Sequence, residues 1–238
     1  AICERRRSSD NIANNKIVCN HAKYIVDIAK SYLVGNPVAY SCSDGYDIEA
    51  VKNCFAVQDM PSLDAEFEKT MSIFGKAYEL VYADEQSQPK SVCLPPSNTF
   101  IVYGAGVGEI PLYGIHYYKK RDIDGAVTGV CCIVCDRDMI YTYENTADSF
   151  LHMTMTNSQH HYFGKMPMVE YRNNEEKQGD FEQMIPLIDA YNILESDRVN
   201  DKEQFVDAFL FLTGIDLDSE QAKKLREERI LMGYEGAA

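Results

Sequence analysis

Three cysteines within five residues are the strongest candidate for chemistry in this chain. Cys131, Cys132 and Cys135 form the run CCIVC, and a CxxC pair is common in zinc and redox sites. A zinc site needs four convergent ligands, and a redox CxxC normally opens a helix. Here the flanking residues are β-branched and apolar, which predicts a strand with Cys132 and Cys135 on opposite faces. We expect buried or half-buried cysteines; the alternative is a zinc- or thiol-dependent cytoplasmic enzyme that uses the CCIVC segment.

The other motifs that could support catalysis are incomplete. In GAGVGE, Gly104 and Gly106 fit a dinucleotide-binding fingerprint, but Glu109 stands where its third glycine belongs. Pro111 and an apolar stretch follow, which favours a hairpin loop. The sequence contains no GxxxxGK[ST], GxSxG or HExxH motif, and the five histidines show no partner spacing: His21, His116, His152, His160 and His161. We therefore expect no enzyme activity, no catalytic residue, no metal and no cofactor.

Composition limits the class of protein further. The 238 residues are 45% hydrophobic, which is typical of a globular chain, and they carry a formal net charge of −14. Proteins that grip nucleic acid neutralise phosphates with Lys and Arg, so this charge argues against tight DNA binding. No apolar leader opens the sequence, and no run approaches the roughly 18 apolar residues of a membrane span. We expect no membrane contact, and eight free thiols in a reducing cytoplasm.

The order of patterns predicts an α+β fold. Helical spacing covers 20–33, 47–55 and 63–74, and a short strand is predicted at 38–42. Strand patterns then follow one another, which predicts an antiparallel meander of four to six strands. These strands are expected at 77–82, 91–94, 99–103, 112–119, 126–135 and 139–143, with a last one at 166–171 after a polar, mixed stretch.

The stretch from Asn173 to Gly214 is the longest helix-forming part of the sequence. Asp180 is a suitable N-cap, and apolar residues recur mostly at intervals of three and four, so one stripe is expected to face a partner surface. Two interpretations fit this pattern. One is a continuous helix from Asp180 to Phe209, about 45 Å long at 1.5 Å per residue, that acts as a strut in an assembly. The other is an ordinary surface helix broken near residues 196–200.

The last part of the sequence predicts a small β-α-β unit. Residues 209–212 and 230–232 have strand patterns, and Ser219 is placed to cap a helix over 220–228. So short a unit needs neighbours to complete its core. The sequence ends without a helix stop or a polar tail, and we expect it to be a piece of a longer protein.

Several segments together resemble a known family. The specific part is the run NNEEKxxDFE…LIDAYxxxxSDRxND, which begins at Asn173, and residues 14–27, 35–38 and 73–82 support it in the same order. This pattern resembles the portal, or head–tail connector, proteins of tailed double-stranded-DNA phages, of the type found in long-tailed phages of Gram-positive bacteria. The resemblance runs from about Asn14 to the end of the chain.

The resemblance implies a structural subunit of a ring, usually of twelve copies, at one vertex of the capsid in the virion. Genome DNA would pass through its channel during packaging and ejection, and the ring would be assembled in the bacterial host cytoplasm. The implied partners are other copies of the chain, the terminase motor, the head–tail adaptor, and capsid or scaffold protein. Mapped onto this sequence, residues 1–172 resemble a wing domain, 173–208 the first stem helix, and 209–238 part of a clip.

The resemblance also suggests two groups of site residues. Stem and subunit-interface residues are expected at Asn174, Glu175, Lys177, Asp180, Phe181, Ile188, Tyr191, Asp197, Asp201 and Phe205. Clip and partner-docking residues are expected at Phe209, Phe211, Leu225, Ile230 and Met232. The returning stem helix, tunnel loop and crown of the family have no counterpart in these residues.

Overall fold

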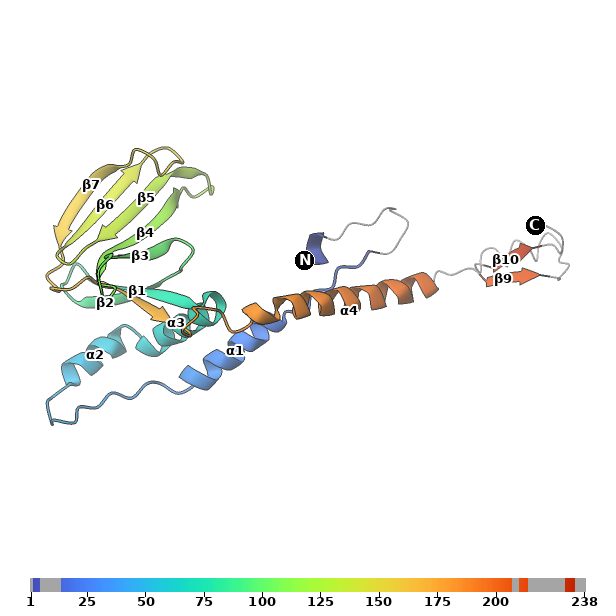
Figure 1. Cartoon of the computed structure of the whole chain (residues 1–238), viewed down its shortest axis with the longest axis horizontal. Helices are drawn as coiled ribbons and strands as arrows, with labels where there is room; N and C mark the ends of the chain where they lie inside the picture. Colours follow the sequence, from blue (N-terminus) through green and yellow to red (C-terminus); the bar gives the residue numbers. More distant parts are fainter. Residues whose placement is uncertain (1, 5–13, 207–209, 214–229, 234–238) are drawn as a thin grey trace. The chain divides into compact units, whose positions relative to one another are not determined.

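The structure is a computed structural model that describes residues 2–4, 14–206, 210–213 and 230–233 (Figure 1). The chain forms two compact units. Residues 22–183 form the larger one, and residues 1–21 together with 184–238 form the other.

Three helices open the larger unit, and the third one covers a sheet. They are α1 (His21–Val34), α2 (Glu49–Val57) and α3 (Met60–Phe74). Gly75 ends α3 in a left-handed conformation, which is the usual C-terminal signal of a helix. Phe67 of α3 packs with Ala77 and Cys93, so the apolar side of α3 lies on the first sheet.

The first sheet is a three-stranded antiparallel layer in the order β2-β1-β8. Its strands are β1 (Lys76–Ala83), β2 (Pro89–Leu94) and β8 (Met168–Arg172). Because side chains alternate along a strand, Ala77 faces α3 while Tyr78 and Leu80 face the other way. These two join a second buried cluster with Leu94, Cys135 and Met168, which connects this sheet to the next one.

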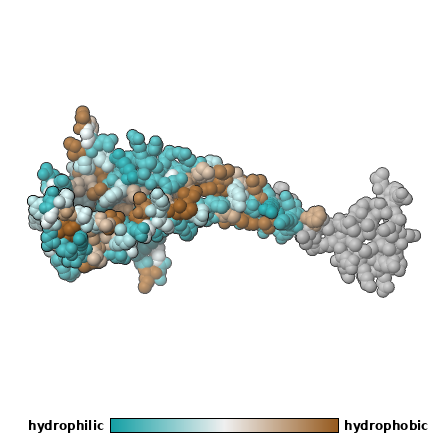
Figure 2. Space-filling model, turned by 90° about the horizontal axis from the view of Figure 1, so that it is seen from below, coloured by the Kyte–Doolittle hydropathy of each residue, from teal (hydrophilic) through white to brown (hydrophobic). Residues whose placement is uncertain are grey.

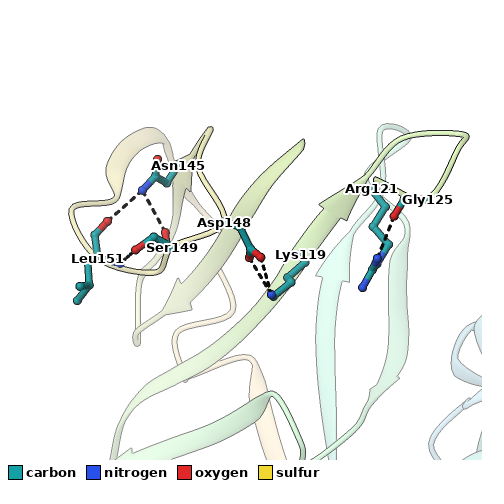
Figure 3. Close-up of polar contacts among 7 residues, drawn as sticks. All are labelled: Lys119, Arg121, Gly125, Asn145, Asp148, Ser149 and Leu151. Atoms are coloured by element: carbon teal, nitrogen blue, oxygen red, sulfur yellow. Dashed lines mark hydrogen bonds and ion pairs between the residues drawn. The ribbon is translucent and has the colours of Figure 1, made fainter. Parts of the chain in front are cut away.

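The second sheet is a five-stranded antiparallel meander in the order β3-β4-β5-β6-β7. It comprises β3 (Thr99–Tyr103), β4 (Pro111–Arg121), β5 (Val127–Cys135), β6 (Met139–Asn145) and β7 (Thr154–His160). At one end of this sheet, Lys119 of β4 pairs with Asp148 at 2.8 Å, and Arg121 donates to the Gly125 carbonyl (Figure 3). The larger unit is therefore layered as α3, the three-stranded sheet and the meander (Figure 1).

Most expected elements of this unit are confirmed, and the fold is α+β. The strand expected at 38–42 is wrong, because none of the described strands pairs with these residues, and Val38 and Tyr40 lie exposed. β7 was not expected: all seven of its side chains are exposed, so it lacks the apolar alternation that marks a half-buried strand. The expected single meander is in fact two sheets, because β8 returns to pair with β1.

The second unit contains a long helix and a pair of short strands. The short 3-10 helix η2 (Glu182–Met184) leads into α4 (Ile185–Val206), and η1 (Ile2–Glu4) contacts α4. β9 (Leu210–Thr213) and β10 (Ile230–Gly233) pair in parallel, as a β-α-β unit requires. The helix expected over 220–228 lies outside the described residues.

Candidate functional site

The cysteine cluster on β5 has the wrong environment for thiol or metal chemistry. Cys131 and Cys135 are 1% and 0% exposed, and Cys132 on the opposite face is half-buried, as the strand pattern predicts. Burial raises the pKa of the Cys135 thiol to about 11, whereas a reactive cysteine needs a depressed pKa. Among the described residues, no group of three or more His, Cys, Asp or Glu side chains is arranged to hold a metal ion.

The glycine-rich run and the histidines serve the fold. Residues 104–110 connect antiparallel strands β3 and β4, so GAGVGE is the hairpin loop that was expected. His116 Nδ1 lies 2.9 Å from Thr99 Oγ1, and burial lowers the pKa of the imidazole. His161 Nε2 lies 3.1 Å from the Asp136 carbonyl. Both contacts join neighbouring segments of the second sheet.

The loop after β8 contains the most specific part of the sequence, and it is bound tightly to the end of α3. The Asp180 amide donates to the Ser72 carbonyl at 2.9 Å, and Ser72 Oγ donates to Asp180 Oδ2 at 2.6 Å. Asn173 Nδ2 donates to Asp180 Oδ1 at 2.7 Å and to the Gln178 carbonyl at 3.0 Å. Asn174 Nδ2 donates to the same carbonyl at 2.7 Å, so the asparagines fix the loop conformation.

Two glycines permit this close approach. A Cβ on Gly75 would lie 1.9 Å from the Lys177 carbonyl oxygen, and Gly75 has a φ of 76°. A Cβ on Gly179 would lie 2.6 Å from the Ile73 carbonyl oxygen. Both contacts are with main chain, which cannot rotate away as a side chain can. In the run after Asn173, Gly179 is therefore required by the close packing of the loop against the end of α3.

Lys177 supports the same loop through charge. Its ammonium lies 3.3 Å from Glu170, whose side chain is 5% exposed. Burial opposes ionisation of Glu170, but hydrogen bonds from Arg172 and Tyr78, together with Lys177, outweigh it and lower the pKa of the carboxyl. Asn174, Lys177 and Asp180 thus have roles within the chain that the sequence did not reveal, while Glu175 is exposed and Phe181 half-buried. Their role at a subunit interface stays a prediction.

The α4 helix buries a polar side, not an apolar one. It is continuous over 22 residues, or about 33 Å at 1.5 Å per residue, with no break at 196–200. Its buried residues are Asn192, Ser196 and Asn200, at 4%, 0% and 0% exposed. They recur every four residues and so lie in a row along one side of the helix.

This polar row binds the extended segment 14–20. Main-chain amides of alternate residues donate to successive turns of α4: Cys19 to Asn192 Oδ1 at 2.8 Å, Ile17 to Ser196 Oγ at 2.9 Å, and Asn15 to Asn200 Oδ1 at 2.7 Å. Two extended residues advance about 6.6 Å and four helical residues about 6.0 Å, so the two repeats stay nearly in register. We call residues 14–20 the N-terminal strap.

The apolar residues of α4 remain largely at the surface (Figure 2). Phe205, Leu194 and Leu187 are 83%, 68% and 62% exposed, and Tyr191 is 41% exposed. Ile193 lies outside the expected apolar stripe, because at 100° per residue it is about 140° around the helix from Ile188. That the stripe faces a partner surface stays a prediction. Of the predicted interface residues on α4, Ile188 and Asp197 are half-buried and Asp201 is exposed.

Comparison with known proteins agrees with these features. Residues 1–234 match the family described as "Phage portal protein, SPP1 Gp6-like". This chain belongs to the phage portal protein family. A curated relative, the portal protein of Bacillus phage SPP1, is 28% identical over 212 residues. That match covers 83% of this chain and 42% of the relative, so the chain spans less than half of the relative's length.

The residues predicted for a clip in this portal-family chain are only partly described. Phe211 lies on β9, and Ile230 and Met232 lie on β10. Phe209 and Leu225 lie outside the described residues. Sequence reasoning missed the polar row of α4, although part of its signal is present: polar residues at i, i+4 and i+8 in a helix. Residues 14–20 show no polar–apolar alternation, so the strap had no signal of its own.

Proposed function

We propose that this chain is part of a structural subunit of the portal ring, located at the portal vertex of a tailed-phage virion. The observation that carries the proposal is the family match over residues 1–234. Within that proposal, residues 1–172 form the wing, 173–208 the stem helix and 209–238 part of the clip. None of the described helices has an apolar run sufficient to span a lipid bilayer.

In this role the ring provides the channel for DNA packaging and ejection. A net charge of −14 suits that task, because each phosphate that a protein neutralises makes DNA binding tighter and more salt-dependent. An acidic subunit lets duplex DNA slide. The ring also offers docking surfaces to the terminase motor, the head–tail adaptor, and capsid or scaffold protein.

The exposed apolar residues of α4 support an assembled state. Leu194 and Phe205 expose 68% and 83% of their surface, and large apolar side chains in a helix are normally covered. We propose that neighbouring subunits in a ring of twelve cover these apolar side chains. The loop residues from Asn174 to Phe181 and the α4 residues from Ile188 to Phe205 would then lie at or near that interface.

Electron microscopy of the longer protein that contains this chain tests the proposal. We expect rings with a central hole about as wide as duplex DNA, and no saturable ATPase activity. Leu194→Glu should reduce the fraction of protein in rings. Val107→Glu is the matched control, because Val107 is a fully exposed apolar residue of the β3–β4 loop and not part of α4. Absence of rings in the unmodified protein, or an ATPase with ordinary turnover, would overturn the assignment.

A further inference from the structure

A cavity of about 550 Å³ opens between the edges of the two sheets in the larger unit. Ile101 and Tyr103 of β3 line one side of it, and Met166 and Met168 line the other. Cavities of this volume are typical of binding sites, and methionine side chains adapt to different apolar partners. The cavity is therefore suited to an apolar group.

The main chain beside this cavity includes two strand edges that pair with no other strand in the described part of the chain. β8 is an edge strand of its sheet, and β3 is an edge strand of the meander. The Val81 amide donates to the Pro167 carbonyl, and the Asn173 amide donates to the Gly75 carbonyl. Because pairing directions alternate along an antiparallel strand, the odd-numbered residues of β8 bond to β1. The amides and carbonyls of Met168 and Glu170 therefore point to the open edge.

The rim of the cavity carries positive charge. Arg137 and Lys165 line it, and both are exposed. The ion pairs found among the described residues include neither of them. Glu170 also lines the cavity, but Arg172 at 2.8 Å and Lys177 at 3.3 Å already neutralise it. In a chain with a net charge of −14, this is a local cationic site.

We propose that the open edge of β8 binds an extended, acidic-apolar segment of another protein. The segment adds a strand to the β2-β1-β8 sheet through the amides and carbonyls of Met168 and Glu170. Its side chains alternate, so an apolar one enters the cavity and an aspartate or glutamate reaches Arg137 and Lys165. Strand addition at an exposed sheet edge is a general mode of peptide recognition, in which main-chain bonds give affinity and pockets give specificity. This site uses the larger unit alone and does not depend on ring assembly.

A random library of twelve-residue peptides, selected on the full 238-residue chain, provides the probe. We expect enriched peptides with alternating apolar residues and at least one acidic residue. For one enriched peptide measured by fluorescence anisotropy, the double variant Arg137→Glu/Lys165→Glu should weaken binding at least tenfold. The matched control is Lys90→Glu/Arg121→Glu, which makes the same charge change at positions that do not line the cavity and should leave binding unchanged.

Two further measurements test the strand pairing itself. Hydrogen exchange at the amides of Met168 and Glu170 should slow when the peptide binds, whereas Val169 and Tyr171, already bonded to β1, should change little. A peptide with methylated main-chain nitrogens should lose binding at least tenfold. Unchanged exchange at Met168 and Glu170, equal binding of the methylated peptide, or enrichment without acidic residues would overturn the proposal. Protection of the same amides by self-association of the free chain would also overturn it, because a second copy would then be the occupant.

Discussion

Replacing Ser196 by alanine tests whether the polar row of α4 holds the N-terminal strap. Ser196 is fully buried, and its Oγ makes two short bonds. It accepts the Ile17 amide at 2.9 Å and donates to the Asn192 carbonyl at 2.7 Å. The substitution removes both bonds and leaves the Ile17 amide facing an apolar methyl group.

The magnitude follows from the cost of an unmade bond. A buried donor left without an acceptor costs about 1–3 kcal/mol. Since 1.4 kcal/mol corresponds to a factor of ten, the strap should open about 5-fold to 150-fold more often. The lost bond to the Asn192 carbonyl contributes little to this figure, because that carbonyl also serves the helix.

Amide hydrogen exchange measured by NMR is the appropriate assay. Exchange of the Ile17 amide should accelerate by the factor given above, and the amides of Asn15 and Cys19 should accelerate with it if the strap detaches as a unit. Ser31→Ala is the matched control, because Ser31 Oγ donates to the Asp27 carbonyl four residues earlier in α1 and accepts no strap amide. An Ile17 exchange rate in Ser196→Ala equal to that in Ser31→Ala would refute the reasoning.

Two further predictions concern the end of α3. Gly75→Ala should lower the free energy of unfolding by at least about 3 kcal/mol in chemical denaturation, because it adds a main-chain clash to an unfavourable positive φ. Gly45→Ala, at a φ of 72° with open space around it, should cost only about 1–2 kcal/mol, and equal losses would contradict the clash. Burial, and then the charge of Asp180, raises the pKa of Glu68, so the folded chain keeps this proton to a higher pH than the unfolded chain. The contribution of Glu68 to stability should therefore fall as pH rises from the unfolded pKa through the raised folded one. In Glu68→Gln the stability should accordingly rise more steeply with pH over that range than in the unmodified chain, whereas exposed Glu66→Gln should not show this change.

Local patterns in the sequence were sufficient for most elements of the larger unit. Helices α1 to α3 and the strands from β1 to β6 follow from periodicity and from turn residues, because both are short-range signals. The strand expected at 38–42 failed since a strand also needs a partner that supplies hydrogen bonds. β7 was missed for the opposite reason. β6 supplies its hydrogen bonds, but the side chains of β7 meet only solvent, so its sequence carries no apolar alternation.

The residues of the loop after β8 indicate the family, but the sequence alone does not show which contacts they make. These residues form the first part of the run by which the chain resembles the family. Their function in the chain depends on the end of α3, about a hundred residues earlier, where Ser72 and Gly75 meet Asp180 and the Lys177 carbonyl. No spacing along the chain reports such a distant contact.

The sequence by itself determined the α+β class, the family, the acidic net charge and the environment of the CCIVC cysteines. These properties depend on composition and on short-range pattern. Only the tertiary structure decided which side of α4 is buried. The helix pattern pointed to apolar residues, but the buried row is Asn192, Ser196 and Asn200, because its partner is the main chain of the strap. A main chain presents amides that need acceptors, and polar side chains at helical spacing provide them.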